Sequence, residues 1–139
     1  MRVFLLVLVL PILCGPARSQ DIASDPEGMI RQVIETGRMD GHVNKQLCWM
    51  GDAAAVHIVK IIGGRNLTGQ EASSVLDILW IAFTAPKLVE NPSDREPRAT
   101  LFVLRYLALD TTDPGLKRRI EEERNHMEGL APFGAGSTH

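Results

Sequence analysis

Apolar residues recur along this chain at the three- and four-residue spacing of amphipathic helices, from about residue 26 to residue 130. Capping residues and breaks at glycine or proline divide the pattern into separate segments. We therefore expect six helices, at about residues 26–36, 42–50, 53–62, 68–84, 98–110 and 114–130. The β-branched run from Val56 to Ile62 falls inside this helical periodicity and does not indicate a strand. The predicted fold class is all-α.

Local signals mark where several of these helices begin. Ser24 and Glu27 are three residues apart, with a proline between them, which is the spacing of a capping box. Thr68 and Glu71 repeat that spacing at the fourth helix. The pair Asp113–Pro114 predicts the start of the last helix, because aspartate caps a helix and proline fits its first turn.

The third, fourth and fifth helices are the most apolar and are predicted to form the core. The fourth is apolar on nearly all sides, apart from a narrow polar stripe of Gln70, Ser74 and Asp77. Trp49 and Trp80 are also predicted core residues, and Trp80 would be an exposed anchor for a partner only if its helix lines a groove. The third and fifth helices contribute the following candidate core residues: Val56, Ile58, Val59, Ile61, Ile62, Leu101, Phe102, Val103, Leu104, Tyr106, Leu107 and Leu109.

The last helix, at 114–130, is predicted to lie on the outside with one face on the core. Its apolar stripe is thin and consists of Leu116, Ile120 and Met127. The remaining positions carry basic and acidic residues four apart, a spacing that brings their side chains together on a helix. These pairs are Lys117/Glu121, Arg118/Glu122 and Arg119/Glu123.

The first nineteen residues have the pattern of an export signal. A positive start at Arg2 is followed by an apolar stretch over residues 3–13, which is too short to span a bilayer. Small residues at Ala17 and Ser19 then predict cleavage before Gln20. We therefore expect the chain to be secreted, or to reside in the periplasm or cell envelope.

The expected domain organisation follows from this signal. It consists of a signal peptide at 1–19, a single α-helical domain at 20–130 and a flexible C-terminal tail at 131–139. The 120 residues that remain after cleavage suffice for one domain and are too few for two. Retention of Cys14 would instead give a lipid-anchored protein.

Charge and cysteine content narrow the classes of partner. Loss of Arg2 and Arg18 with the signal leaves 13 basic against 17 acidic residues, a net charge of −4, which argues against broad binding of nucleic acid or anionic lipid. No other segment is long and apolar enough for a membrane span.

Cys48 would be the one remaining cysteine and is predicted to be a buried thiol. Asn66 begins a glycosylation acceptor triplet, which matters only in a eukaryotic secretory pathway.

Residues 47–62 resemble the middle of a HEAT repeat. In that family a helix ends in an apolar-Gly-Asp turn, and the next helix carries Ala-Val and then an aliphatic residue three positions on. The matching residues are Met50, Gly51, Asp52, Ala55, Val56 and Val59. Gly51 would reverse the backbone tightly, Asp52 would cap the following helix, and Ala55 would let two helices approach closely.

This resemblance implies a short α-solenoid that binds protein through one face of its stacked helices, and it implies no catalytic residues. A compact bundle of six helices is the alternative architecture, because a stable solenoid usually needs three or more repeats.

The chain carries no recognisable catalytic, cofactor or metal motif. No two of its four histidines have the spacing of a zinc-binding helix, and there is no Gly-x-Ser-x-Gly elbow or phosphate-binding loop. The charged connection from Glu90 to Arg98 is the most interesting stretch, because loops held by rigid elements often carry function. The candidate partner-binding residues are Glu90, Asp94, Arg95, Arg98 and, from the helix before them, Trp80.

The same connection also has a structural interpretation, in which Ser93 and Glu96 cap the fifth helix while Arg95 and Arg98 pair locally. Taken together, the sequence predicts an exported, non-enzymatic helical module that binds an unidentified protein and needs no cofactor. Two alternatives stay open. One is a small secreted hydrolase using the Glu90–Arg98 loop, and the other is a lipid-anchored structural protein of the envelope.

Overall fold

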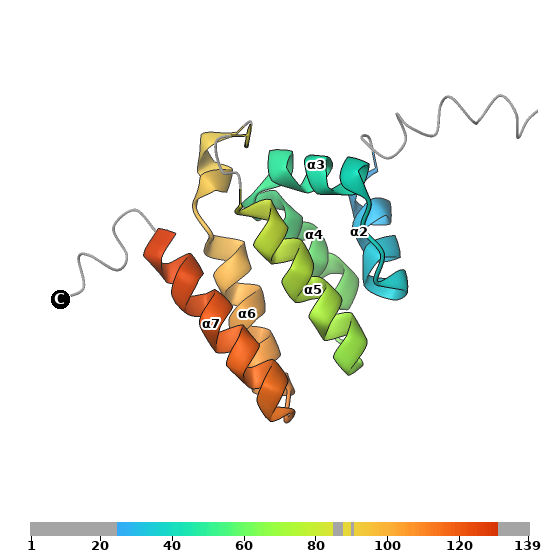
Figure 1. Cartoon of the computed structure of the whole chain (residues 1–139), viewed down its shortest axis with the longest axis vertical. Coiled ribbons are helices and arrows are strands. Elements are labelled where there is room, and N and C mark those ends of the chain that lie inside the picture. Colours follow the sequence, from blue (N-terminus) through green and yellow to red (C-terminus); the bar gives the residue numbers. More distant parts are fainter. Residues whose placement is uncertain (1–24, 85–87, 90, 131–139) are drawn as a thin grey trace, which may run out of the picture.

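The computed structural model describes residues 25–84, 88–89 and 91–130. Within these residues the chain forms six α-helices and one short 3-10 helix, without a strand (Figure 1). The elements are α2 (Pro26–Thr36), α3 (Gly41–Met50), α4 (Asp52–Ile62), α5 (Gly69–Ala82), η2 (Pro92–Arg95), α6 (Arg98–Asp110) and α7 (Pro114–Leu130). The all-α prediction is confirmed, and each helix begins and ends within two residues of its predicted bounds.

Three of the sequence predictions concern other parts of the chain. The signal peptide at 1–19 with Cys14, the tail at 131–139 and the site candidate Glu90 lie outside the described residues. Among the helices that the structure does describe, none has the length and apolar character needed to cross a membrane.

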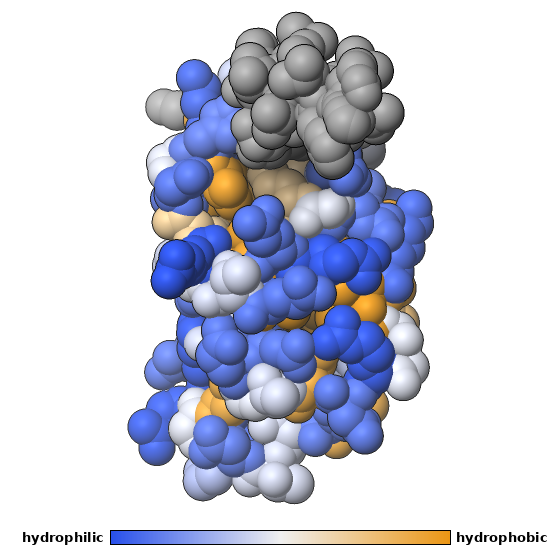
Figure 2. Space-filling model, turned by 90° about the vertical axis from the view of Figure 1, so that its right-hand side faces the viewer, coloured by the Kyte–Doolittle hydropathy of each residue, from blue (hydrophilic) through white to orange (hydrophobic). Residues whose placement is uncertain are grey.

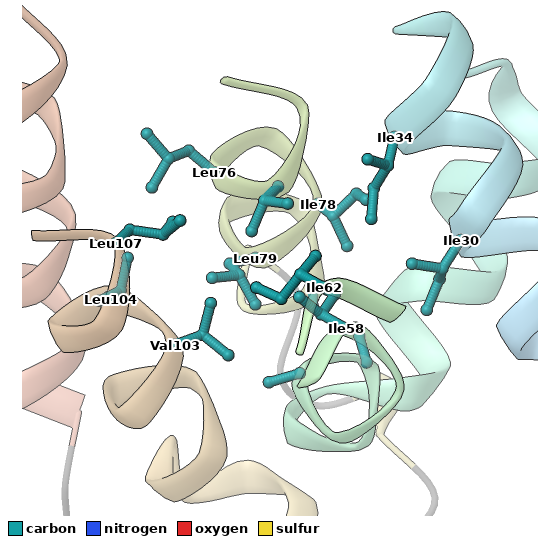
Figure 3. Packing of buried hydrophobic residues seen from close by; sticks show 14 of the residues in the cluster. Ile30, Ile34, Ile58, Ile62, Leu76, Ile78, Leu79, Val103, Leu104 and Leu107 are labelled. Atoms are coloured by element: carbon teal, nitrogen blue, oxygen red, sulfur yellow. The ribbon is translucent and has the colours of Figure 1, made fainter. Parts of the chain in front are cut away.

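Each helix packs against the helix two places further along the chain. α4 lies between α2 and α6, and α5 packs against both α3 and α7. α4 and α5 also contact each other, as do α6 and α7, so α4 and α5 occupy the centre of the molecule (Figure 1). Aliphatic side chains from α2, α4, α5 and α6 point toward one another between these helices (Figure 3). Fully buried members include Ile30, Ile34, Ile58, Leu76, Ile78, Leu79, Val103 and Leu104.

The burial predicted for α6 is wrong on one side of the helix. Val103, Leu104 and Leu107 are buried, but Phe102 is 58% and Leu109 89% exposed. The reason is that α6 lies at the edge of the fold, where α4 and α7 cover one stripe of it and leave the rest to solvent. The same correction applies to Val56 on α4, which is exposed although it belongs to an almost continuous apolar run.

The helix caps show which local signals determine the element boundaries. Thr68 Oγ1 accepts a hydrogen bond from the Glu71 N–H at 3.1 Å, and Glu71 Oε1 accepts from the Thr68 N–H at 3.0 Å, so the predicted capping box is confirmed. At α2, Asp25 caps the helix by accepting from the Gly28 N–H at 3.0 Å, whereas Ser24 of the predicted capping box lies outside the described residues. Proline at the first helical position makes the residue immediately before it the cap.

The side of the molecule that carries α2 is mainly polar. Where Figure 2 colours this face, hydrophilic residues predominate and apolar groups show between them in small areas. Since one apolar face of α2 is buried through Met29, Ile30, Val33 and Ile34, its outer positions are left for polar residues such as Arg31, Gln32 and Glu35.

Candidate functional site

The predicted partner-binding loop is held against the body of the protein at the turn between α3 and α4. Asp52 Oδ2 accepts a hydrogen bond from the Ala99 N–H and Oδ1 accepts from the Thr100 N–H, both at 2.8 Å. Asp52 therefore caps α6, and the prediction that it caps its own helix is wrong, since the N-cap of α4 is Gly51. Asp52 is the first residue of α4, and its carboxylate reaches the start of α6. Pro97, which precedes α6, provides no side-chain cap for that helix.

The charged side chains of this loop differ in how far local contacts engage them. Arg98 pairs with Glu96 at 2.7 Å, which confirms the local pairing predicted for Arg98, while Arg95 is exposed. Asp94 is partly buried, and this burial raises the pKa of its carboxyl, with the nearby charge of Asp52 as a second cause. The capping role predicted for Ser93 and Glu96 is wrong, because Asp52 fills it. Of the structural interpretation, only the local pairing of Arg98 is therefore confirmed.

Trp80 lies elsewhere, on the side of α5 that faces α7. It lines a hollow of about 290 Å³ together with Arg119, Glu122, Glu123 and His126, and none of the loop residues is among this lining. The prediction of Trp80 as a core residue is wrong, since it is 41% exposed. Its helix does line a groove, which is the condition under which the sequence predicted an exposed anchor.

The rings of Trp80 and His126 form the aromatic wall of this hollow. Their centroids are 4.7 Å apart and their planes are inclined by 45°. A tilted pair of this kind holds the indole in place while leaving part of its face open to solvent. Trp80 is therefore a positioned aromatic surface rather than a loose side chain.

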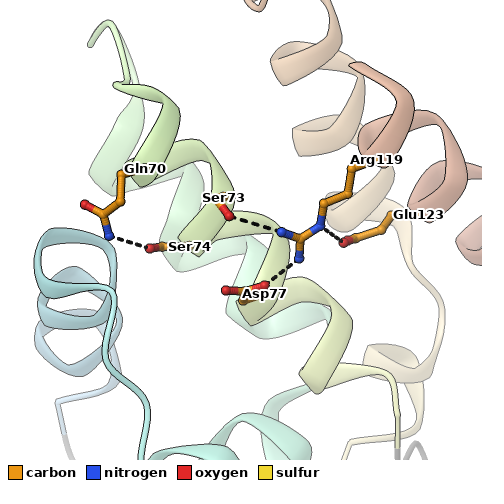
Figure 4. A network of polar contacts seen from close by, with 6 residues as sticks. All are labelled: Gln70, Ser73, Ser74, Asp77, Arg119 and Glu123. Carbon is orange, nitrogen blue, oxygen red and sulfur yellow. Dashed lines mark hydrogen bonds and ion pairs between the residues drawn. The ribbon is translucent and has the colours of Figure 1, made fainter. Parts of the chain in front are cut away.

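Arg119, another residue of the lining, joins α5 and α7 (Figure 4). Its Nη2 donates to Asp77 Oδ1, its Nη1 donates to Ser73 Oγ at 3.1 Å, and its Nε donates to Glu123 Oε2 at 3.0 Å. Ser73 and Asp77 are four residues apart on α5, as are Arg119 and Glu123 on α7, so each helix presents two polar groups on one face. All three nitrogens of the guanidinium are therefore engaged in the contact between the helices.

The polar stripe predicted on α5 divides between two neighbours. Gln70 Nε2 donates to Ser74 Oγ at 3.4 Å on the side near Gly37 at the end of α2, whereas Asp77 faces α7 (Figure 4). On α7, only the third of the predicted base–acid pairs, Arg119/Glu123, forms among the described ion pairs, and Glu121 pairs with Arg124 instead. The stripe is thus an interhelical contact rather than a solvated face.

Glu123 is the most unusual group in the site. It is 5% exposed, and its Oε1 atom is buried without a hydrogen-bond partner in the described part of the chain. Burial raises the pKa of this carboxyl to about 7, and the charge of Asp77 acts in the same direction, while Arg119 opposes the shift. The hollow is therefore lined by one carboxyl group that changes its charge near neutral pH.

We expect Glu123→Gln to flatten the loss of stability with rising pH. The raised pKa means that the folded state carries an unfavourable carboxylate, a penalty that is absent below pH 4.5 and complete above about pH 7. From pH 5 to pH 8 the free energy of unfolding of the wild type should therefore fall relative to that of the variant. The difference should be at least about 1.4 kcal/mol, the equivalent of one pKa unit. Urea unfolding at both pH values measures this, and parallel pH profiles would contradict it.

Sequence analysis did not identify the residues of α7 that form this hollow. Arg119, Glu123 and His126 follow one another at i, i+4 and i+7, which places them on one face of the helix. That spacing is visible in the sequence, but nothing in it tells which neighbouring helix the face meets. In the described residues, those of the hollow included, no group of three or more His, Cys, Asp or Glu side chains could hold a metal ion.

No family model, curated protein or solved structure matches this chain.

Proposed function

We propose that this protein is an exported, non-enzymatic helical module that binds another protein in the hollow between α5 and α7. The observation that carries the proposal is the half-exposed Trp80, which packs against His126 and lines the hollow together with Arg119. Tryptophan and arginine are enriched among the residues that dominate binding energy at protein interfaces. A ring held in place before binding also loses little conformational entropy when a partner covers it.

The N-terminal pattern supports export, to the cell envelope, the periplasm or the medium. Cleavage before Gln20 and retention of a lipid on Cys14 predict different masses, so the intact mass of the exported protein distinguishes a free module from a lipid-anchored one. The net charge of −4 after cleavage favours a protein partner over nucleic acid or anionic lipid.

A HEAT-like arrangement is part of the proposal. α2, α4 and α6 follow one another as one row of helices, and α3, α5 and α7 follow one another as a second row. Stepwise packing of this kind supports a short array, in which α4 pairs with α5 and α6 with α7. The buried Ala55 on α4 has the small side chain that close packing requires. The hollow lies between two neighbours of the second row.

Partner binding is better supported than the hydrolase alternative. That alternative uses the Glu90–Arg98 loop, where Glu96 is engaged by Arg98 at 2.7 Å. The predicted contribution of Asp94, Arg95 and Arg98 to partner binding stays a prediction, since these residues lie outside the lining of the hollow.

Trp80→Ala should weaken partner binding by about 30-fold or more, the equivalent of a hot-spot residue worth 2 kcal/mol. The matched control is Trp49→Ala, because Trp49 on α3 is 39% exposed, close to the 41% of Trp80, but does not line the hollow. The mature protein from Gln20, used as bait with cross-linking in extracellular or envelope fractions, identifies the partner by mass spectrometry. Binding of the purified partner to the wild type, Trp80→Ala and Trp49→Ala is then measured by calorimetry.

Equal losses for the two tryptophan variants would contradict the assignment of the hollow as the binding site. Failure to capture any saturable partner would contradict the proposed function itself.

A further inference from the structure

We infer that the hollow between α5 and α7 receives the guanidinium of an arginine side chain from the partner protein, which stacks on Trp80 and pairs with Glu122. This inference rests on the proposed function and specifies the chemistry of the partner. Three independent features of the described residues lead to it: the balance of charge, an unpartnered buried acceptor and the aromatic wall.

The charges around the hollow are out of balance. Arg119 is the one cation of the lining, and its nitrogens are already engaged with Ser73, Asp77 and Glu123. Asp77 balances this charge by pairing with Arg119 from outside the lining. Glu122 then adds an exposed carboxylate that has no ion pair among the described residues, beside Glu123 with its pKa of about 7. The hollow therefore has an excess of acidic groups, which favours a cationic ligand.

The buried acceptor makes this more than a cluster of surface acids. The side chain of Glu123 is 7% exposed and lines the hollow, and its Oε1 has no hydrogen-bond partner in the part of the chain that the structure describes. This atom is closed to solvent, so a positive group bound in the hollow would stabilise the carboxylate through its charge and not by a hydrogen bond to that oxygen. Glu122, which is exposed at the same hollow, can reach that group directly.

The aromatic wall favours guanidinium over ammonium. A guanidinium is planar and weakly hydrated, so it stacks on an indole ring while its N–H groups still reach a carboxylate at the edge. A lysine ammonium keeps its hydration more strongly and offers no flat face to Trp80. Arginine thus satisfies the ring and the acids together.

The test is an NMR titration of the mature chain with N-acetyl-arginine methylamide, followed at the indole N–H of Trp80. A Trp49→Phe variant assigns the two indole signals. We expect saturable shifts at Trp80 but not at Trp49, and binding that is at least tenfold weaker for the neutral N-acetyl-citrulline methylamide. Glu122→Gln should weaken binding about tenfold, whereas Glu121→Gln, which changes an exposed acid of the same helix outside the lining, should leave it unchanged.

Equal binding of the citrulline probe, equal shifts at both indoles or absence of saturation would each overturn the inference. Free L-arginine carries a carboxylate that the acidic hollow repels, so tighter binding of the free amino acid would identify a small-molecule ligand and also overturn it. The titration needs no partner. Its failure therefore leaves the Trp80→Ala result as a separate test, and a successful titration with unchanged partner binding in Trp80→Ala would refute only the proposed function.

Discussion

Asp52→Ala is expected to lower the free energy of unfolding by about 2–4 kcal/mol. The substitution leaves the Ala99 and Thr100 N–H groups without their acceptor at the start of α6, and an unpaired buried donor costs about 1–3 kcal/mol. Thr100 is fully buried, so water cannot easily replace the lost bond. Ala99 and Thr100 lie 47 and 48 positions after Asp52 in the sequence. Loss of these two hydrogen bonds therefore also loosens the packing of α4 against α6.

The control for this prediction is Asp113→Ala. Asp113 accepts a single hydrogen bond, from the Gly115 N–H at 3.2 Å, at the exposed start of α7. Loss of an exposed cap costs about 1 kcal/mol. Urea unfolding followed by circular dichroism compares the two variants, and a cost for Asp52→Ala no greater than that for Asp113→Ala would refute the role assigned to Asp52.

Gly51→Ala should lower the melting temperature by more than about 10 °C. Gly51 has φ +58° and ψ −130°, a conformation that residues with a Cβ rarely adopt. A Cβ here would lie 2.5 Å from the main-chain oxygen of Asp94 and 2.9 Å from Val89 Cγ2, so the loop would have to move away from the turn. Backbone strain of about 1–2 kcal/mol adds to this clash, and in a domain of this size each kcal/mol corresponds to about 4–8 °C.

Gly64→Ala separates backbone strain from the clash. Gly64 also has a positive φ, of +75°, but an added Cβ would meet no atom within 4 Å. The control should therefore show the strain alone and cost about 1–2 kcal/mol. Scanning calorimetry of both variants measures the difference, and similar melting temperatures would show that the loop does not rest on Gly51.

The helices could be predicted from the sequence because their signals are local. Thr68 and Glu71 lie within one turn of each other, and Asp113 immediately precedes Pro114, so each pair marks a helix start without reference to the rest of the fold. The role of Asp52 could not be predicted in the same way. An aspartate after a glycine predicts a cap for the helix that follows it. Only the packing of α4 on α6 brings the Ala99 N–H to 2.8 Å from Asp52 Oδ2.

The candidate site was predictable only in part, for a related reason. α5 is apolar on nearly all sides, so its sequence does not show which side its neighbours leave open at Trp80. The facing residues of α7 are charged, and the sequence predicts only pairs along their own helix, because nothing local relates Arg119 to Ser73, 46 positions earlier. Exposure of Phe102 on α6 has the same origin, since burial depends on the number of neighbouring helices.

The most direct test of the central claim is site-specific photo-cross-linking from α7. A photoreactive amino acid is placed either at Glu122, which lines the hollow, or at Asn125, which is exposed on the same helix outside that lining. We predict a covalent adduct with one partner protein from position 122 only, abolished by excess unlabelled wild-type protein but not by excess Trp80→Ala. Equal adducts from the two positions, or equal competition by both proteins, would contradict the claim that a partner binds in this hollow.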